Sequence, residues 1–163
     1  MHCPMKKSSN RIEDARHTPD PEINDDRGRL AGHVRVREVL IVDDEEPLLL
    51  SIDDGLSVYK KYFTLLTATN GIEAVQVLKE EASIDLVITD LRMPRMDGFE
   101  LLTYIRRNYP RIPVILMTAY GTPKIESITR SMEIFSYLEK PLDINVIADN
   151  IFSALSIQYP QIC

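Results

Sequence analysis

The chain reads LVITDLRMPRMDG over residues 86–98, and this stretch is the most informative part of the sequence. Four β-branched or aliphatic residues in a row are typical of a strand that is buried on both faces of a parallel sheet. The strand ends on an acid, Asp90, and a loop with proline and glycine follows. Residues 39–44, VLIVDD, have the same form, with an acid pair after four aliphatic residues. In open α/β sheets, ligands bind at the carboxyl ends of the strands.

Strand and helix patterns alternate from residue 36 to residue 156. Apolar runs predict five strands, over Val36–Val42, Thr64–Ala68, Leu86–Thr89, Val114–Thr118 and Ser136–Leu138. Apolar residues at helical spacing predict five helices, over Glu46–Lys61, Gly71–Glu81, Gly98–Asn108, Pro123–Met132 and Asp143–Ser156. This alternation indicates the α/β class, with a doubly wound, five-stranded parallel sheet and right-handed crossovers.

One domain is expected, over residues 36–158. Residues 1–35 are polar and lack apolar periodicity, so we expect a disordered N-terminal tail. Residues 159–163 form a short C-terminal end. Only seven residues follow Ser156, which is too few for a second domain within this sequence.

Composition excludes several classes of function. Residues 36–163 carry 12 Lys/Arg against 19 Asp/Glu, whereas direct nucleic-acid binding needs a concentrated basic face. No stretch is apolar enough to span a membrane, and no secretory signal is evident, so we expect a cytoplasmic protein without membrane partners. Cys3 and Cys163 lie near opposite ends of the chain, which argues against a disulfide framework or a zinc site.

Four strand ends carry chemically active groups. In a sheet of order 2-1-3-4-5, the strand that ends at Asp43 and Asp44 neighbours the strand that ends at Asp90. Three carboxylates this close together repel one another unless a cation offsets their negative charge. Mg²⁺ is a natural candidate, because it takes oxygen ligands and can also bind a phosphate of the substrate. Asp90 is the candidate nucleophile, which would form an acyl phosphate, while Thr118 and Lys140 would bind phosphoryl oxygens. Each residue alone also fits an ordinary loop or turn position; their joint placement favours the site.

The chain from Val36 to about Ser156 resembles the receiver domain of two-component response regulators. Four runs carry the resemblance, in the order of the family: Val39–Glu46, Thr89–Gly98, Met117–Ala119 and Tyr137–Pro141. The resemblance implies the flavodoxin-like receiver fold. The sequences of Met117–Thr122 and Tyr137–Pro141 are most similar to those in receivers of nitrogen-regulator-type activators. These activators carry an ATPase and a DNA-binding domain downstream.

The resemblance assigns roles at the acceptor site. It implies that Asp90 takes a phosphoryl group from a sensor histidine kinase or a histidine phosphotransfer protein. It also implies Mg²⁺ as the cofactor, held by Asp43, Asp44, Asp90 and the backbone carbonyl of Arg92. Lys140 would be the family's lysine, and the bond from Lys140 to the following proline, Pro141, would be cis, which is inexpensive for an X–Pro bond.

A switch is also implied, with Thr118 and Tyr137 as its hydroxyl–aromatic pair. Phosphorylation adds about −1.5 to −2 charge units, which would draw Thr118 toward the phosphoryl group and admit Tyr137 into the vacated space. The face built from residues 123–132, 136–138 and 143–156 would then change shape and dock a downstream protein. Whether the module forms a homodimer is left open. One departure from the family lies on this face, where bulky Ile134 replaces a small residue.

Two other classes of function compete with a receiver module. A haloacid-dehalogenase-type phosphatase also uses an aspartyl nucleophile, but it needs a second acid two residues later, where this chain has Arg92. We therefore expect no enzyme beyond a module that catalyses its own phosphorylation and dephosphorylation. A binding module that is never phosphorylated is the third class, against which the full set of acids, threonine and lysine argues.

Overall fold

A computed structural model describes residues 35–81, 83–119, 127–128 and 130–158. Its strands form one parallel sheet of order β2-β1-β3-β4-β5, as predicted. The strands are β1 (Arg37–Val42), β2 (Phe63–Ala68), β3 (Ile84–Asp90), β4 (Val114–Thr118) and β5 (Ser136–Glu139). The helices are α1 (Glu46–Leu56), the 3₁₀ helix η2 (Ser57–Tyr59), α2 (Gly71–Glu80), α3 (Gly98–Asn108) and α5 (Ile144–Ala154). Half of the helix expected over Pro123–Met132, and nearly all of the tail expected over residues 1–35, lie outside the described residues.

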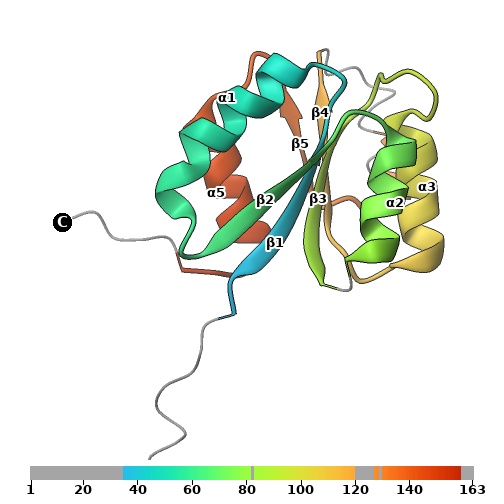
Figure 1. Ribbon diagram of the computed structural model, residues 1–163. Coiled ribbons are helices and arrows are strands. Elements are labelled where there is room, and N and C mark those ends of the chain that lie inside the picture. The colour runs from blue at the N-terminus through green and yellow to red at the C-terminus, as the bar shows by residue number, and fades with distance from the viewer. Residues whose placement is uncertain (1–34, 82, 120–126, 129, 159–163) are drawn as a thin grey trace, which may run out of the picture. The chain divides into compact units, whose positions relative to one another are not determined.

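The sheet is covered on both faces (Figure 1). α1 and α5 pack with Val39 and Ile41 of β1 in one apolar cluster, whereas α2 and α3 pack with Leu40 and Val42 in the other. All four of these β1 side chains are buried. Two covered faces explain why the strands read as unbroken apolar runs rather than as an alternation of apolar and polar residues.

The end of α1 differs from the prediction. We expected a helix to Lys61, but α1 ends at Leu56 and the chain tightens into η2. The backbone N–H of Tyr62 then donates to the carbonyl of Tyr59 at 2.8 Å, and β2 begins at the buried Phe63. Tyr59 follows the helical spacing because its ring packs against Phe63 and Phe152, not because the helix continues. The other observed boundaries lie within two residues of the predicted ones.

Gly98 fixes how the chain leaves β3. A Cβ atom at this position would lie 2.2 Å from the carbonyl oxygen of Asp90, so only glycine fits. The N–H of Gly98 donates to the carbonyl of Leu91 at 3.1 Å, and Asp97 caps α3 through a capping box with Glu100. The loop after Asp90 therefore turns back tightly on the strand end, which holds the Asp90 side chain at the edge of the sheet.

Candidate functional site

The predicted site residues meet at the carboxyl edge of the sheet. Asp43 follows β1, Asp90 ends β3, Thr118 ends β4 and Lys140 follows β5, and these four strands are consecutive neighbours. Asp43, Asp90 and Thr118 are 0%, 6% and 4% exposed. Two carboxyl groups this deeply buried require charged or hydrogen-bonding partners.

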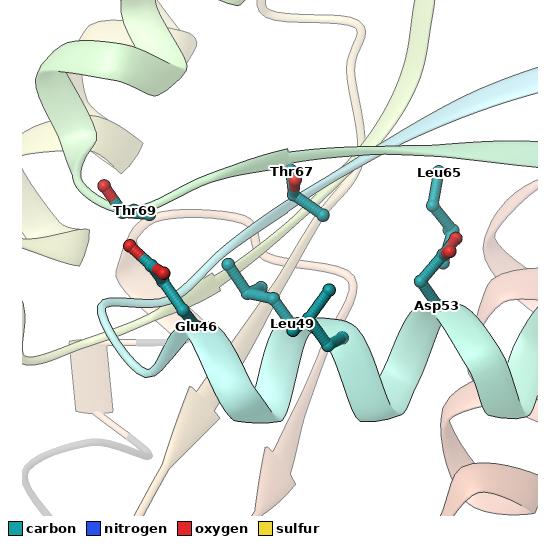
Figure 2. A pocket seen from close by; sticks show the side chains of 7 residues that line it. Glu46, Leu49, Asp53, Leu65, Thr67 and Thr69 are labelled. Carbon is teal, nitrogen blue, oxygen red and sulfur yellow. The ribbon is translucent and has the colours of Figure 1, made fainter.

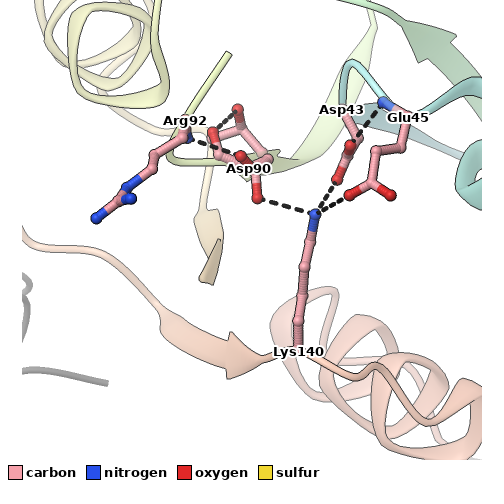
Figure 3. Close-up of polar contacts among 6 residues, drawn as sticks. Asp43, Glu45, Asp90, Arg92 and Lys140 are labelled. Carbon is pink, nitrogen blue, oxygen red and sulfur yellow. Dashed lines mark hydrogen bonds and ion pairs between the residues drawn. The ribbon is translucent and has the colours of Figure 1, made fainter. Parts of the chain in front are cut away.

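The ammonium group of Lys140 joins the acids (Figure 3). Its Nζ lies 2.8 Å from Oδ2 of Asp43 and 3.1 Å from Oδ1 of Asp90. It also lies 3.2 Å from Oε1 of Glu45, whose side chain is 64% exposed. One cation thus joins the carboxyl ends of β1, β3 and β5. The sequence reasoning missed Glu45, because nothing in the acidic run after β1 distinguishes it from the neighbouring solvated acids.

Backbone donors orient the remaining carboxylate oxygens. The N–H of Glu45 donates to Oδ1 of Asp43 at 2.9 Å, and the N–H of Arg92 donates to Oδ2 of Asp90 at 2.7 Å. The hydroxyl of Thr89 donates to the carbonyl of Asp90 at 3.0 Å. The side chain of Arg92 is exposed and extends away from Asp90 (Figure 3). Both buried acids are therefore fixed in orientation, whereas the Arg92 guanidinium does not cover the acceptor in this structure.

Burial and pairing act in opposite directions on the charges of the site. Burial raises the pKa of Asp43 above its ordinary value, although the hydrogen bonds from Lys140 and from the Glu45 backbone lower it. Burial alone would lower the pKa of Lys140, but its hydrogen bonds to Asp43 and Asp90 outweigh burial and raise that pKa well above its usual range. Lys140 therefore stays cationic at any physiological pH.

The three acids do not form a ready-made metal centre. Among the described residues, no group of three or more His, Cys, Asp or Glu side chains is arranged to hold a metal ion. Asp44 is exposed, and the ammonium of Lys140 contacts both Asp43 and Asp90. The donor set nevertheless fits Mg²⁺, since carboxylate oxygens and a backbone carbonyl are the hard oxygen ligands that this ion takes.

The predicted switch residues lie on neighbouring strands. Thr118 is buried at the end of β4, and its carbonyl accepts a hydrogen bond of 2.8 Å from the backbone N–H of Lys140. Tyr137 of β5 pairs with Leu116 of β4 in the register of the sheet and is 40% exposed. The Lys140–Pro141 bond is cis, as predicted.

Ile134, the bulky residue before β5, is accommodated with the help of hydrogen bonds from Arg106 that the sequence did not predict. Ile134 and Met132 pack against the cluster under α2 and α3. The guanidinium of Arg106 on α3 donates to three backbone carbonyls, those of Ile112, Met132 and Glu133, at 2.9–3.0 Å. Because one side chain holds both segments that lead into β4 and β5, the packing of this face is defined despite the departure at Ile134.

Comparison with known proteins identifies the family. Residues 39–152 match the response regulator receiver domain. The chain belongs to this family. Over 122 residues it is 37% identical to the transcriptional regulatory protein GlrR of Escherichia coli (strain K12), covering 75% of this chain and 27% of GlrR. Over 121 residues it is 30% identical to sporulation initiation phosphotransferase F of Bacillus subtilis (strain 168), covering 74% of this chain and 95% of that protein.

Solved receiver structures share the fold. The signal receiver domain of an HD domain-containing protein from Pseudomonas fluorescens Pf-5 superposes with a TM-score of 0.68 at 34% identity, covering 75% of this chain and 96% of that one. This chain spans about a quarter of the length of regulators such as GlrR. It is a receiver module of two-component signalling. No helix in the described part of the chain is long and apolar enough to cross a bilayer.

Proposed function

We propose that Asp90 of this receiver domain accepts a phosphoryl group from a phosphohistidine on a sensor kinase or a phosphotransfer protein. A carboxylate oxygen of Asp90 attacks phosphorus, the P–N bond to the donor imidazole breaks, and an acyl phosphate forms. The observation that carries the proposal is the ammonium of Lys140, which lies 3.1 Å from Asp90 and is anchored at 2.8 Å by the buried Asp43. It is already positioned to neutralise charge on an incoming phosphoryl group.

Positioning and charge neutralisation supply most of the acceleration in phosphoryl transfer, because the transition state is loose. After transfer, Lys140 pairs with a phosphoryl oxygen while Asp43 keeps the ammonium in place. Asp43, Asp44, Asp90 and the backbone carbonyl of Arg92 would hold Mg²⁺, which would neutralise further phosphoryl charge. The domain promotes only its own phosphorylation and dephosphorylation, in keeping with receiver domains, which are generally not enzymes acting on separate substrates.

The signal leaves through the face that contains β5 and α5. Phosphorylation draws the Thr118 hydroxyl toward Asp90, and Tyr137 moves inward. Exposed apolar side chains support a docking role for this face, since Phe135, Tyr137 and Val146 are 45%, 40% and 47% exposed. An apolar surface whose shape depends on Tyr137 would distinguish the two states for a downstream protein.

A relay role is a second candidate. This chain covers 95% of sporulation initiation phosphotransferase F, whose name describes transfer of phosphate, but only 27% of GlrR. We propose residues 36–158 as the phosphorylated unit in either case, with no direct contact to nucleic acid from these residues. A cytoplasmic location stays a prediction, which cell fractionation would test. Whether the module forms a homodimer stays open, and sedimentation would decide it.

The test is the intact mass of the protein after incubation with acetyl phosphate and Mg²⁺. The parent chain should gain one phosphoryl group, and Asp90→Asn should gain none. Asp54→Asn is the matched control, because it removes an exposed acid from α1 and should leave the yield unchanged. Equal labelling of Asp90→Asn and the parent would overturn the assignment.

A further inference from the structure

β2 is an edge strand without the usual protection. It pairs with β1 and, within the part of the chain that the structure describes, with no other strand. Its sequence, FTLLTA over residues 63–68, has no charged residue and no proline, and its register with β1 is unbroken by a bulge. Natural edge strands commonly carry charges, proline or bulges, which block pairing with another chain. Among the described residues, the outer edge of β2 therefore has neither a partner strand nor these safeguards, which leaves it suited to an added strand.

A groove runs between this strand and α1 (Figure 2). Its volume is about 370 Å³. Leu49, Leu50 and Leu65 supply its apolar lining, and Leu50 is 72% exposed. Thr67 and Thr69 also line it, and two acids come from α1, Glu46 near one end and Asp53 near the other (Figure 2). The groove thus combines leucine and threonine side chains with a negative charge at each end.

We propose that this edge binds an extended, basic segment of a partner protein. The segment adds as a sixth strand beside β2, so that its backbone pairs with the free edge. Every second side chain of the segment then faces the groove. Lysine or arginine fits there, because the methylene stem covers Leu50 and Leu65 while the charged head reaches Glu46 or Asp53.

A second copy of this chain is a poorer occupant. Pairing of two β2 strands about a two-fold axis would bring the same acidic patch onto itself. Residues 36–163 carry 19 Asp/Glu against 12 Lys/Arg, so the approach of two copies is opposed over the whole domain. The same negative charge attracts a basic segment. The charge of the groove therefore favours a different protein as the partner.

The surface is separate from the phosphorylation site. None of the hydrogen bonds and ion pairs of Asp90 and Lys140 described above involves a residue that lines the groove. Binding there should therefore be measurable on the unphosphorylated protein, and Asp90→Asn should bind as the parent does. If Asp90 were not phosphorylated, the peptide-binding test would still be valid. If the peptide did not bind, the phosphorylation of Asp90 would be unaffected.

The probe is a fluorescent peptide of alternating lysine and valine, titrated with the full chain and followed by fluorescence anisotropy. Hydrogen exchange of the β2 amides should slow on binding. Leu50→Lys should weaken the peptide about tenfold, since it removes an apolar contact and adds a repelling charge. Asp53→Asn should weaken it about two- to fivefold, and added salt should weaken it further.

Val58→Lys is the matched control, because Val58 is also 72% exposed but does not line the groove. It should leave affinity unchanged, whereas peptides with glutamate in place of lysine, or with an N-methylated backbone, should not bind. Equal weakening by Val58→Lys and Leu50→Lys, or retained binding of the N-methylated peptide, would overturn the proposal. So would self-association that Leu50→Lys abolishes, since it would assign the edge to a second copy.

Discussion

Replacing Lys140 with methionine should destabilise the domain by about 3 kcal/mol at neutral pH. Removing one partner of a buried ion pair typically has an effect of this size, because the other charge is left uncompensated. Here two carboxylates are left: Asp43, with a side chain 0% exposed at 2.8 Å, and Asp90, with a side chain 9% exposed at 3.1 Å. The third contact, to Glu45, adds little because that side chain is 64% exposed.

The loss of stability in Lys140→Met, relative to the parent, should depend on pH. Burial already raises the pKa of Asp43, and loss of the ammonium removes an interaction that lowers it. A carboxyl whose pKa is higher in the folded state stabilises that state below its unfolded pKa, about 3.9, and loses this contribution as pH rises through the folded pKa. The variant should therefore approach the parent near pH 4. The parent alone should lose stability at strongly alkaline pH, as Lys140 deprotonates through its raised pKa.

Urea denaturation followed by circular dichroism at pH 7 and at pH 4 measures both effects. Lys79→Met is the control, since it removes an exposed cation from the last turn of α2 and should change stability by less than about 1 kcal/mol. A loss of stability in Lys140→Met no larger than that of the control at pH 7 would show that Lys140 does not stabilise the two buried carboxylates. A deficit of the same size at both pH values would show that the uncompensated carboxylates are not its cause.

Three further predictions concern the metal, the loop and the lifetime of the phosphorylated state. Asp43→Ala and Asp44→Ala should each bind Mg²⁺ markedly more weakly in a metal titration, because few protein ligands hold the ion; unchanged affinity would remove that residue from the site. Gly98→Ala should lower the free energy of unfolding by about 2 kcal/mol or more, since its Cβ would lie 2.2 Å from a backbone oxygen; an unchanged thermal midpoint would contradict this. Arg92→Asn/Tyr120→Glu should lose phosphate faster than the parent in a dephosphorylation time course, because Arg92, turned in from its outward position, and Tyr120, two residues after Thr118, would both shield the phosphoryl group from water; equal rates would exclude shielding.

The sheet and the acceptor site could be predicted because their signals are local. Unbroken apolar runs gave the parallel strands, and the polar residue at each strand end placed Asp90, Thr118 and Lys140 along one edge. Glu45 and Arg106 could not be predicted in the same way. Their contacts join segments 95 and 26 residues apart, and nothing in the local pattern marks such a pairing.

The end of α1 was misplaced for a related reason. Tyr59 fits a helical period equally well whether the helix continues or an aromatic cluster holds the side chain, and only its packing on Phe63 and Phe152 separates the two. Tyr120, two residues after Thr118, lies outside the described residues, so its place beside the acceptor stays a prediction. The metal ligands also stay a prediction, since the ion pairs of Lys140 with Asp43 and Asp90 do not test them.

Borohydride reduction tests whether the phosphoryl group forms an acyl phosphate on Asp90. The protein is phosphorylated with acetyl phosphate and Mg²⁺, reduced, digested and sequenced by mass spectrometry. Borohydride converts an aspartyl phosphate to homoserine and leaves free aspartates unchanged. Homoserine should appear at position 90 alone. Homoserine at Asp43 or Asp44, or at no position in a protein that has gained phosphoryl mass, would contradict it.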